Sequence, residues 1–359
     1  MKIRLGKRLN EKQIFIIGAV IIIILGVIIT SLVYFGKKNK ITEPKPDDSI
    51  IQEPVEEPEK TPNKLKIVDE KSTSRPFAIM INNINIARPL QSGLQDAYLI
   101  YEMIVEGGIT RYMALFMDQN TARIGSIRSA RHYYLDYALE NDAIYVHHGQ
   151  SPEAASDFKS LNVDRIVVDN NKTGWRDKSL HVSSEHTLFT SISKLQNGLG
   201  KLRTTRKNGL LLNYSVEEID LSTISTAIPA NNVNIKYSNY ITSSYVYDAT
   251  NGYYLRSVNG QKHADYVTKE QYHFKNIITY QVSNYTLNDG ENKGRQELEN
   301  IGSGTGYYIT NGYAIPINWS KSSRSQPTKY TLPNGEELKV NDGNTFIQIQ
   351  PKNQTLTIN

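Results

Sequence analysis

The feature that most restricts this chain is an unbroken apolar run near its N-terminus, from Ile14 to Phe35. These 22 residues are enough to span a bilayer as a helix, and the run is apolar all round. A secretory signal peptide has a shorter core and small residues at its cleavage site, but here SLVYFGKK follows. Five positive residues precede the run, which favours a cytoplasmic N-terminus. We predict a cytoplasmic basic tail at 1–13, a single-pass signal anchor at 14–35 and an extracytoplasmic remainder.

The net charge of +5 originates in the N-terminal region alone. Residues 1–40 hold eight Lys or Arg and one Glu, a charge of +7, so the rest of the chain carries −2. A domain that neutralises nucleic-acid phosphates should itself be basic, so we expect no nucleic-acid partner. Cysteine is absent, which excludes disulfides, a thiol nucleophile and a lipid-modified cysteine. Residues 36–74 are rich in Pro and Glu, and we predict a disordered stalk there.

The most unusual stretch of the remainder is YEMIVEGGITRYMALFMDQNTARIGSIRSARHYY, from Tyr101 to Tyr134. It combines glutamates and arginines with the apolar pattern of regular structure, where charge is costly. The runs on either side of the Gly107-Gly108 pair predict two strands joined as a hairpin. In a strand, Glu102 and Glu106 would share a face about 13 Å apart, too far for a glycosidase pair, whereas a helix would bring them within about 6 Å. We favour strands, in which the two glutamates do not act as partners.

The segment SIRSAR, residues 126–131, leads into a run with helical spacing. We predict that Ser126 caps this helix, which places Arg128 and Arg131 near its first turns. The helix dipole disfavours positive charge there, so a phosphate or carboxylate would compensate it. The alternative is a set of structural ion pairs with Glu102, Glu106 or Asp136. The candidate ligand-binding residues are Asn83, Arg111, Arg123, Arg128, Ser129 and Arg131.

Three histidines are further candidates. The run AIYVHHGQSPEAASDF predicts a strand ending near His147, a glycine turn, and a helix that Ser151 caps. Adjacent histidines on a strand point to opposite faces, so we do not expect His147 and His148 to hold one metal. Either could serve as a general base or bind an anion. The run SEHTLFTSISKL predicts another helix start, near His186.

The domain plan follows from a change in pattern along the chain. Strands and helices alternate at 75–205, which indicates an N-terminal mixed domain of α/β type. Residues 206–230 have no clear period and are interpreted as a junction. At 231–359, short tyrosine-rich runs alternate with Asn-Gly and Asp-Gly turns, so we predict a mostly β C-terminal domain and an α+β protein overall. We interpret most of its tyrosines as strand residues rather than as a binding face.

Several long motifs resemble the YerB-like family, envelope lipoproteins of Gram-positive bacteria whose two domains are of unknown function. In the first domain they are RPFAIMINN, ARPLQSGLQDAYLIYEMIVEGGITRYMALF, IGSIRSARHYY, YVHHGQSPEA and HTLFT. In the second they are YLRSVNGQKHAD, NIITYQV, GRQELENIGSGTGYYITNGYAIPINWSK and LPNGEELKVNDGNTFIQIQP. The resemblance covers almost everything after the stalk and implies a two-domain envelope protein, but it carries over no catalytic residue. Where family members are expected to have a lipidated cysteine, this chain has the apolar run.

Location, domain plan and the charged stretch together predict a binding or scaffold protein of the cell envelope. Its expected partners are an anionic cell-wall polymer or an envelope protein of wall synthesis, and the membrane through the N-terminal helix. The alternative is a peptidoglycan- or glycan-acting hydrolase or transferase, with Glu102 or Glu106 as acid/base and a histidine, His147, His148 or His186, assisting. That hypothesis requires these groups to converge in one cleft. We expect no cofactor and no metal, and the sequence leaves enzymatic activity open.

Overall fold

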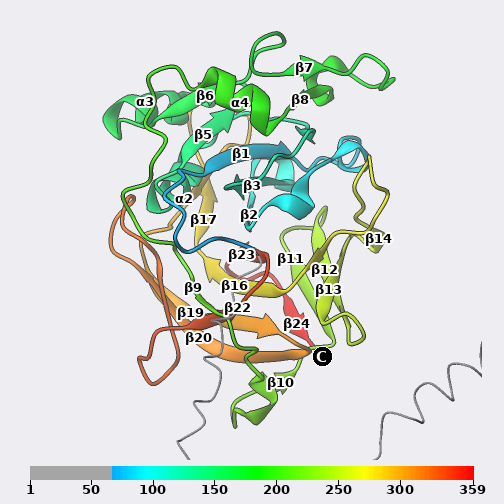
Figure 1. Ribbon diagram of the computed structural model, residues 1–359, viewed down its shortest axis with the longest axis vertical. Coiled ribbons are helices and arrows are strands. Elements are labelled where there is room, and N and C mark those ends of the chain that lie inside the picture. The colour runs from blue at the N-terminus through cyan, green and yellow to red at the C-terminus, as the bar shows by residue number, and fades with distance from the viewer. Residues whose placement is uncertain (1–66) are drawn as a thin grey trace, which may run out of the picture. The chain divides into compact units, whose positions relative to one another are not determined.

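The structure is a computed structural model that describes residues 67–359 (Figure 1). Strands make up most of its regular structure and helices are few. Within 67–359 no helix is both long and apolar enough to cross a bilayer. The predicted tail, the predicted anchor and most of the predicted stalk lie outside the described residues.

An 11-stranded sheet forms the centre of the fold, and both halves of the chain contribute to it. Its strand order is β10-β20-β19-β16-β23-β2-β3-β1-β5-β6, with β21 paired to β20. β2 and β23 pair in parallel, from Leu99 opposite Thr345 to Glu102 opposite Gln348, and so join the two halves. The strands are β1 (Phe77–Asn82), β2 (Leu99–Ile104), β3 (Thr110–Phe116), β5 (Ile144–His147), β6 (Arg165–Val167), β10 (Ile228–Pro229), β16 (Asn276–Val282), β19 (Gly302–Thr310), β20 (Tyr313–Lys321), β21 (Lys329–Thr331) and β23 (Thr345–Pro351).

A second, six-stranded sheet comes from the C-terminal half, in the order β14-β13-β12-β11-β24 with β15 paired to β13. Its strands are β11 (Asn232–Lys236), β12 (Thr242–Asp248), β13 (Tyr253–Val258), β14 (Gln261–Lys262), β15 (His273–Phe274) and β24 (Leu356–Ile358). Three small sheets complete the strand pairing: β17 (Asn284–Thr286) with β18 (Gln296–Leu298), β22 (Lys339–Asn341) with β9 (Asn213–Ser215), and β4 (Ile124–Gly125) with β8 (Leu188–Thr190) and β7 (Trp175–Arg176).

The helices are short. They are α2 (His132–Glu140), α3 (Pro152–Ser160) and α4 (Ile192–Gly198), with 3-10 turns η1 (Arg88–Leu90), η2 (Leu94–Asp96), η3 (Glu106–Gly108), η4 (Ser184–His186) and η5 (Leu221–Thr223). Ser151 caps α3 as predicted, because its side chain accepts the amide of Ala154, and Pro152 occupies the first position. α3 connects β5 to β6, which are parallel, so this part of the chain forms a βαβ unit.

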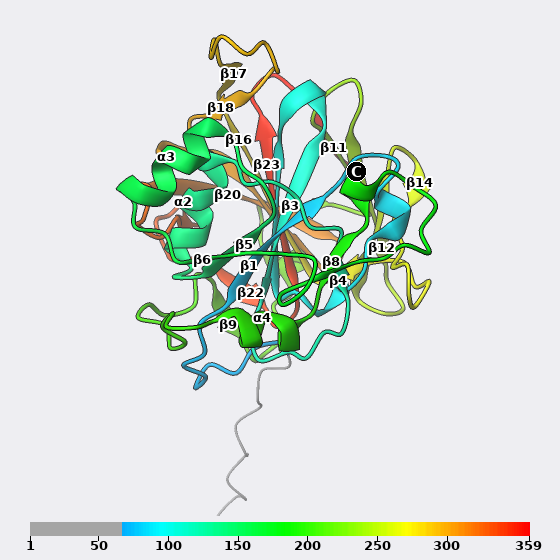
Figure 2. The ribbon, with the colours of Figure 1, turned by 90° about the horizontal axis from the view of Figure 1, so that it is seen from above.

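The central sheet has other elements packed on both of its faces. Figure 2 shows α2 and α3 on one side of β1, β3 and β23, and the six-stranded sheet on the other. Neighbouring residues of β2 therefore point into different layers. The hydroxyl of Tyr101 bonds Glu140 of α2, whereas the carboxylate of Glu102 bonds Ser243 of β12. Because both faces of β2 are covered by other elements, the strand is apolar at nearly every position and does not alternate between apolar and polar residues.

Two predicted helix starts are wrong. Ser126 caps no helix: α2 begins at His132 with Arg131 in the capping position. Residues 126–131 are extended instead, because their amides bond neighbouring strands, as when Arg128 N–H donates to Met80. The run from Ser184 forms only a 3-10 turn, and the β-branched and aromatic residues that follow it enter β8. The next helix, α4, starts after the cap residue Ser191.

The hairpin predicted around the Gly107-Gly108 pair is confirmed. β2 and β3 pair antiparallel from Leu99 opposite Leu115 to Ile104 opposite Thr110. Both glycines have positive φ, 67° and 70°, a conformation that other residues adopt only with strain. Several C-terminal tyrosines are strand and core residues as predicted: Tyr245 in β12 and Tyr254 in β13 are fully buried, whereas Tyr240 and Tyr285 are exposed.

Candidate functional site

Two of the predicted arginines, Arg111 and Arg131, share Glu106 where the hairpin turn meets the start of α2, and the positive charge of Arg128 is near enough to contribute to lowering the pKa of Arg111. We call Arg111, Arg128 and Arg131 together with Glu106 the arginine cluster. Glu106 is its central carboxylate: it accepts a short hydrogen bond from Arg131, and its other oxygen lies 3.6 Å from Arg111 Nη2. The hairpin places Glu106 just beyond the end of β2, and Arg111 follows one residue into β3.

Backbone pairing holds the other two arginines in place. The extended segment 126–131 lies between β1 and the turn after β5, because His148 N–H donates to Arg128 and Ala130 N–H donates to Gly149. A carbonyl of this segment also fixes Arg111, whose Nη1 donates to Ser129 at 2.8 Å. Ser129 therefore contributes its backbone to the cluster, while its hydroxyl lies against Gly149.

The cluster holds more positive than negative charge. Burial and the adjacent Arg131 lower the pKa of Arg111 to about 10, so it stays protonated near neutral pH. Burial opposes the ionisation of Glu106, but the hydrogen bond from Arg131 and the charges of both arginines outweigh it and lower its pKa. The second carboxylate, Glu185, bonds Arg128 at 2.8 Å and is more than half exposed at its side chain. Three guanidinium groups thus face two carboxylates, one of them at the surface.

A fourth arginine, which was not predicted from the sequence, borders the cluster. Arg176 donates to the Ser184 carbonyl and lies 3.4 Å from His148 Nε2. It reaches this place because β7 and β8 bring residues 175–190 back beside the turn after β5. Nothing in the local sequence of Arg176 or Glu185 marks them, since their proximity to Arg128 arises from tertiary structure.

The three histidines do not form one site. His147 is buried, and its Nδ1 bonds the Gly149 carbonyl at 2.8 Å. Burial lowers its pKa to about 4, which leaves it neutral at pH 7. His148 follows the end of β5, is half-buried and bonds the Val168 carbonyl. His186 bonds Asn82 and lies beside Glu185, and burial lowers its pKa as well.

Glu102 belongs to a different environment, a buried polar network between the two large sheets. One of its oxygens accepts from Thr110 and Asn83, and the other accepts from Ser243 and Arg256. Glu102 and Arg256 both have fully buried side chains. Asn83, predicted as a ligand-binding residue, is likewise fully buried and also accepts from Arg88. Both residues are hydrogen-bonded within the protein interior.

These contacts give no support to the hydrolase alternative. Glu102 is enclosed and paired, and Glu106 is held ionised by two arginines, whereas a general acid needs a raised pKa. No described contact joins either glutamate to His147, His148 or His186. Groups of His, Asp and Glu suited to holding a metal are absent from residues 67–359.

Arg123 lies apart from the arginine cluster. Its guanidinium bonds Asp177 at 2.9 Å and stacks 3.6 Å above the Phe189 ring. It has no described contact with Arg111, Arg128 or Arg131. Of the four predicted arginines, two therefore share Glu106, and Arg128 lies near enough to act on Arg111 through its charge.

Comparison with known proteins places the chain in a family. Residues 64–205 match the N-terminal domain, and residues 233–347 the C-terminal domain, of the family described as "Protein of unknown function (DUF3048)". The chain is 31% identical over 297 residues to "Putative lipoprotein YerB" of Bacillus subtilis, which covers 80% of this chain and 84% of that protein. It is also similar to the crystal structure of YerB from Bacillus subtilis, with a TM-score of 0.69 and 26% identity over 82% of this chain and 99% of the other. The resemblance to YerB-like proteins is confirmed, and the chain belongs to the DUF3048 family.

Proposed function

We propose that this protein is an extracytoplasmic binding protein of the cell envelope, anchored through residues 14–35, and that the arginine cluster holds an anionic ligand. The relative described as a lipoprotein supports an envelope location. The apolar run would take over the role of the lipid, since the chain has no cysteine. The proposed partners are an anionic wall polymer or an acidic envelope protein.

A single observation carries the proposal: Glu106 is shared by two arginines, and the ion-pair partner that Arg128 has within residues 67–359 is an exposed carboxylate. Elsewhere the numbers of arginines and carboxylates balance: Arg256 pairs with Glu102, and Arg75 and Arg203 share Asp142 while Arg75 also pairs with Asp164. In the cluster, three guanidinium groups lie near one half-buried carboxylate, Glu106. A phosphate or carboxylate can accept two parallel hydrogen bonds from one guanidinium, so a polymer that repeats such groups suits this arrangement.

The test is binding of the full chain, purified in detergent, to polyphosphate and to poly-glutamate, with neutral dextran as reference. Arg128→Glu combined with Arg131→Glu should weaken binding of the anionic polymers at least about 10-fold, since charge-assisted hydrogen bonds are lost and repulsion is added. Lys159→Glu combined with Lys201→Glu is the matched control. Both lysines are exposed, and the pair changes the net charge equally. Control binding should stay within about 2-fold.

The dependence of binding on salt concentration tests whether the polymer is held by charge. Wild-type binding should fall as the salt concentration rises, and the Arg128/Arg131 variant should show a shallower dependence. Equal losses in the two double variants would refute the cluster as the site, provided that thermal unfolding shows both to be folded. Polymer binding that matches dextran in the wild type would refute the proposal outright.

The anchor has its own test. Alkaline phosphatase fused after Asn359 should be active in cells, because the enzyme folds only outside the cytoplasm, and deletion of 14–35 should abolish its activity. An inactive fusion to the full chain would overturn the proposed topology.

A further inference from the structure

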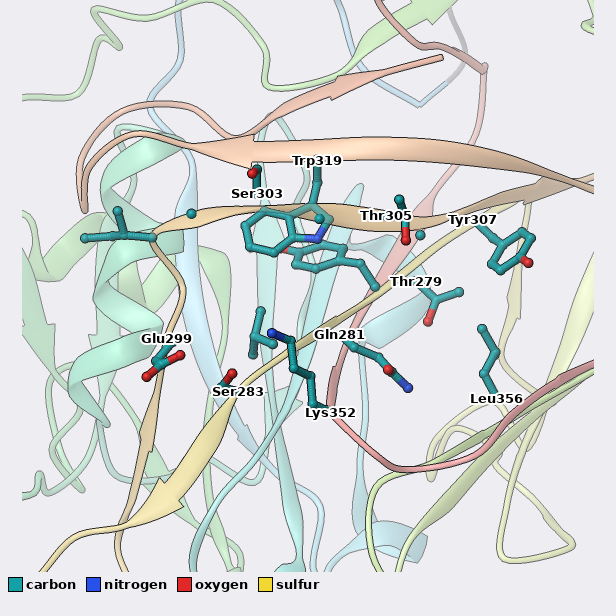
Figure 3. Close-up of a pocket in the computed structure, with 16 residues that line it drawn as sticks. Thr279, Gln281, Ser283, Glu299, Ser303, Thr305, Tyr307, Trp319, Lys352 and Leu356 are labelled. Atoms are coloured by element: carbon teal, nitrogen blue, oxygen red, sulfur yellow. The ribbon is translucent and has the colours of Figure 1, made fainter. Parts of the chain in front are cut away.

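A groove opens where two neighbouring strands of the central sheet separate. β16 and β19 pair from Asn276 opposite Thr310 to Tyr280 opposite Gly306. Both strands continue into the β17–β18 pair, which resumes with Asn284 opposite Leu298. Between the two ladders, the three residues 281–283 lie opposite the seven residues 299–305, an extreme form of β-bulge. The result is a cavity of about 610 Å³ (Figure 3).

One wall of the groove is a strand edge with which no other strand of the described part of the chain pairs. Residues 302–305 remain paired with β20, but β16 no longer reaches them. The two-residue turn Asn311-Gly312 has positive φ at both positions, which makes Thr310 and Tyr313 a hydrogen-bonded pair. Hydrogen-bonded and open positions alternate along an antiparallel strand. The backbone N–H and C=O groups of Ser303 and Thr305 therefore face the groove.

The groove also contains polar side-chain atoms that need partners. Trp319 Nε1 and Thr279 Oγ1 both line it, and neither has a hydrogen-bond partner among residues 67–359. Their residues are only 4% and 1% exposed. Buried polar atoms of this kind are nearly always hydrogen-bonded in a folded protein, so the wall of the groove is unusual at these two positions. Figure 3 shows Trp319 reaching from β20 across β19, where the missing side chain of Gly304 leaves room for the indole.

The kind of ligand follows from what the groove offers. Sugar binding commonly uses the exposed face of an aromatic ring, but Trp319 and the adjacent Tyr280 are 4% and 2% exposed and pack against each other at 4.8 Å, which leaves Tyr307 as the one partly exposed ring in the lining. An extended polypeptide needs alternating backbone donors and acceptors, which Ser303 and Thr305 present. The charges at the rim are of both signs, Glu299 and Lys352, and neither has a described ion-pair partner. A peptide with acidic and basic side chains matches that rim.

We propose that this groove is a peptide-binding site, in which an extended segment of another protein adds as a strand to the open edge of β19. The segment hydrogen-bonds to Ser303 and Thr305, and its polar side chains meet Glu299 and Lys352. The site is independent of the arginine cluster, which lies on other elements.

The test uses Trp319 as the reporter. The chain has two tryptophans, so Trp175→Phe leaves Trp319 alone to fluoresce. The probes are acetylated, amidated eight-residue peptides in which Thr or Val alternates with Lys or Glu, added to the full chain in detergent. At least one should change the emission of Trp319 with saturation below the millimolar range. Methylation of alternate backbone nitrogens in that peptide should weaken binding at least about 10-fold, because strand hydrogen bonds are lost.

Two substitutions of Thr305 test whether its backbone N–H binds the peptide. Thr305→Pro removes the N–H that faces the groove and leaves the β20 pairing without a lost bond, so it should weaken peptide binding at least about 10-fold. Thr305→Val keeps that N–H and removes only the hydroxyl, so binding should stay within about 3-fold. Arg128→Glu with Arg131→Glu should not alter peptide binding, which separates this site from the proposed anion site.

Three outcomes would overturn the proposal. They are an unchanged Trp319 emission with every peptide up to a few millimolar, equal binding of the N-methylated peptide, and a Trp319 response to N-acetylglucosamine tetrasaccharide in place of the peptides. The last of these would make the groove a glycan site.

Discussion

Replacing Arg256 by methionine should destabilise the protein by about 3–5 kcal/mol. Arg256 and Glu102 form an ion pair of 2.8 Å in which both side chains are fully buried, and methionine leaves the carboxylate enclosed without its countercharge. Arg256 also lies 4.9 Å above the Phe346 ring, a contact that methionine would keep only in part. With an m value of about 3 kcal/mol/M, the midpoint of urea unfolding should fall by about 1–1.7 M.

A double-mutant cycle gives the decisive measurement. Glu102→Gln with Arg256→Met should cost less than the sum of the two single variants, by about 1–3 kcal/mol, because no unpaired charge remains. The exposed pair Arg128–Glu185 is the control, and Arg128→Met should cost at most about 1 kcal/mol. The reasoning would be refuted by additive losses in the cycle, or by an Arg256→Met loss as small as that of Arg128→Met.

Three further predictions concern stability. His147 has a pKa of about 4 in the folded state, below the ordinary value of about 6.5, so the unfolded chain binds a proton at this residue first as the pH falls. The free energy of unfolding should therefore drop between pH 6.5 and 4 by up to about 3 kcal/mol more in the wild type than in His147→Gln. Urea titration at each pH measures this difference. Ser151→Ala should cost about 1 kcal/mol through the lost cap of α3, whereas Ser156→Ala in the same helix should be nearly neutral in the same unfolding assay. Gly93→Ala should lower the free energy of unfolding by at least about 2 kcal/mol, because φ is +81° and the new Cβ would lie 2.5 Å from a backbone oxygen. In the control Gly209→Ala the new Cβ meets nothing within 4 Å, so the melting temperature should stay unchanged.

Local signals in the sequence predicted the features that depend on a few neighbouring residues. The Gly107-Gly108 turn and the Ser151-Pro152 cap were both identified because each uses residues with a strong conformational preference. The prediction that Ser126 caps a helix was wrong because it used the same kind of local preference: serine favours helix caps, but here the backbone of its segment pairs with β1. Tertiary hydrogen bonds outweighed the local preference.

The candidate site was predictable only in part. The ion pairs of Arg111 and Arg131 with Glu106 join residues within one continuous stretch, so their closeness could be anticipated. The partner of Glu102 could not be, because Arg256 lies 154 positions away and reaches it from another sheet. The groove beside β19 was missed as well. It depends on unequal numbers of residues in two facing segments, which no pattern in either segment reveals.

The place of β23 in the central sheet has a consequence for synthesis. This strand, close to the end of the chain, lies between β2 and β16 and is parallel to both. Until Thr345–Pro351 has been made, β2 and β16 each keep an open apolar edge, and such edges are sites of aggregation. The central sheet therefore stays incomplete until residues 345–351 have been made. Completion of residues 345–351, rather than of the boundary between the two halves, decides when the central sheet can close.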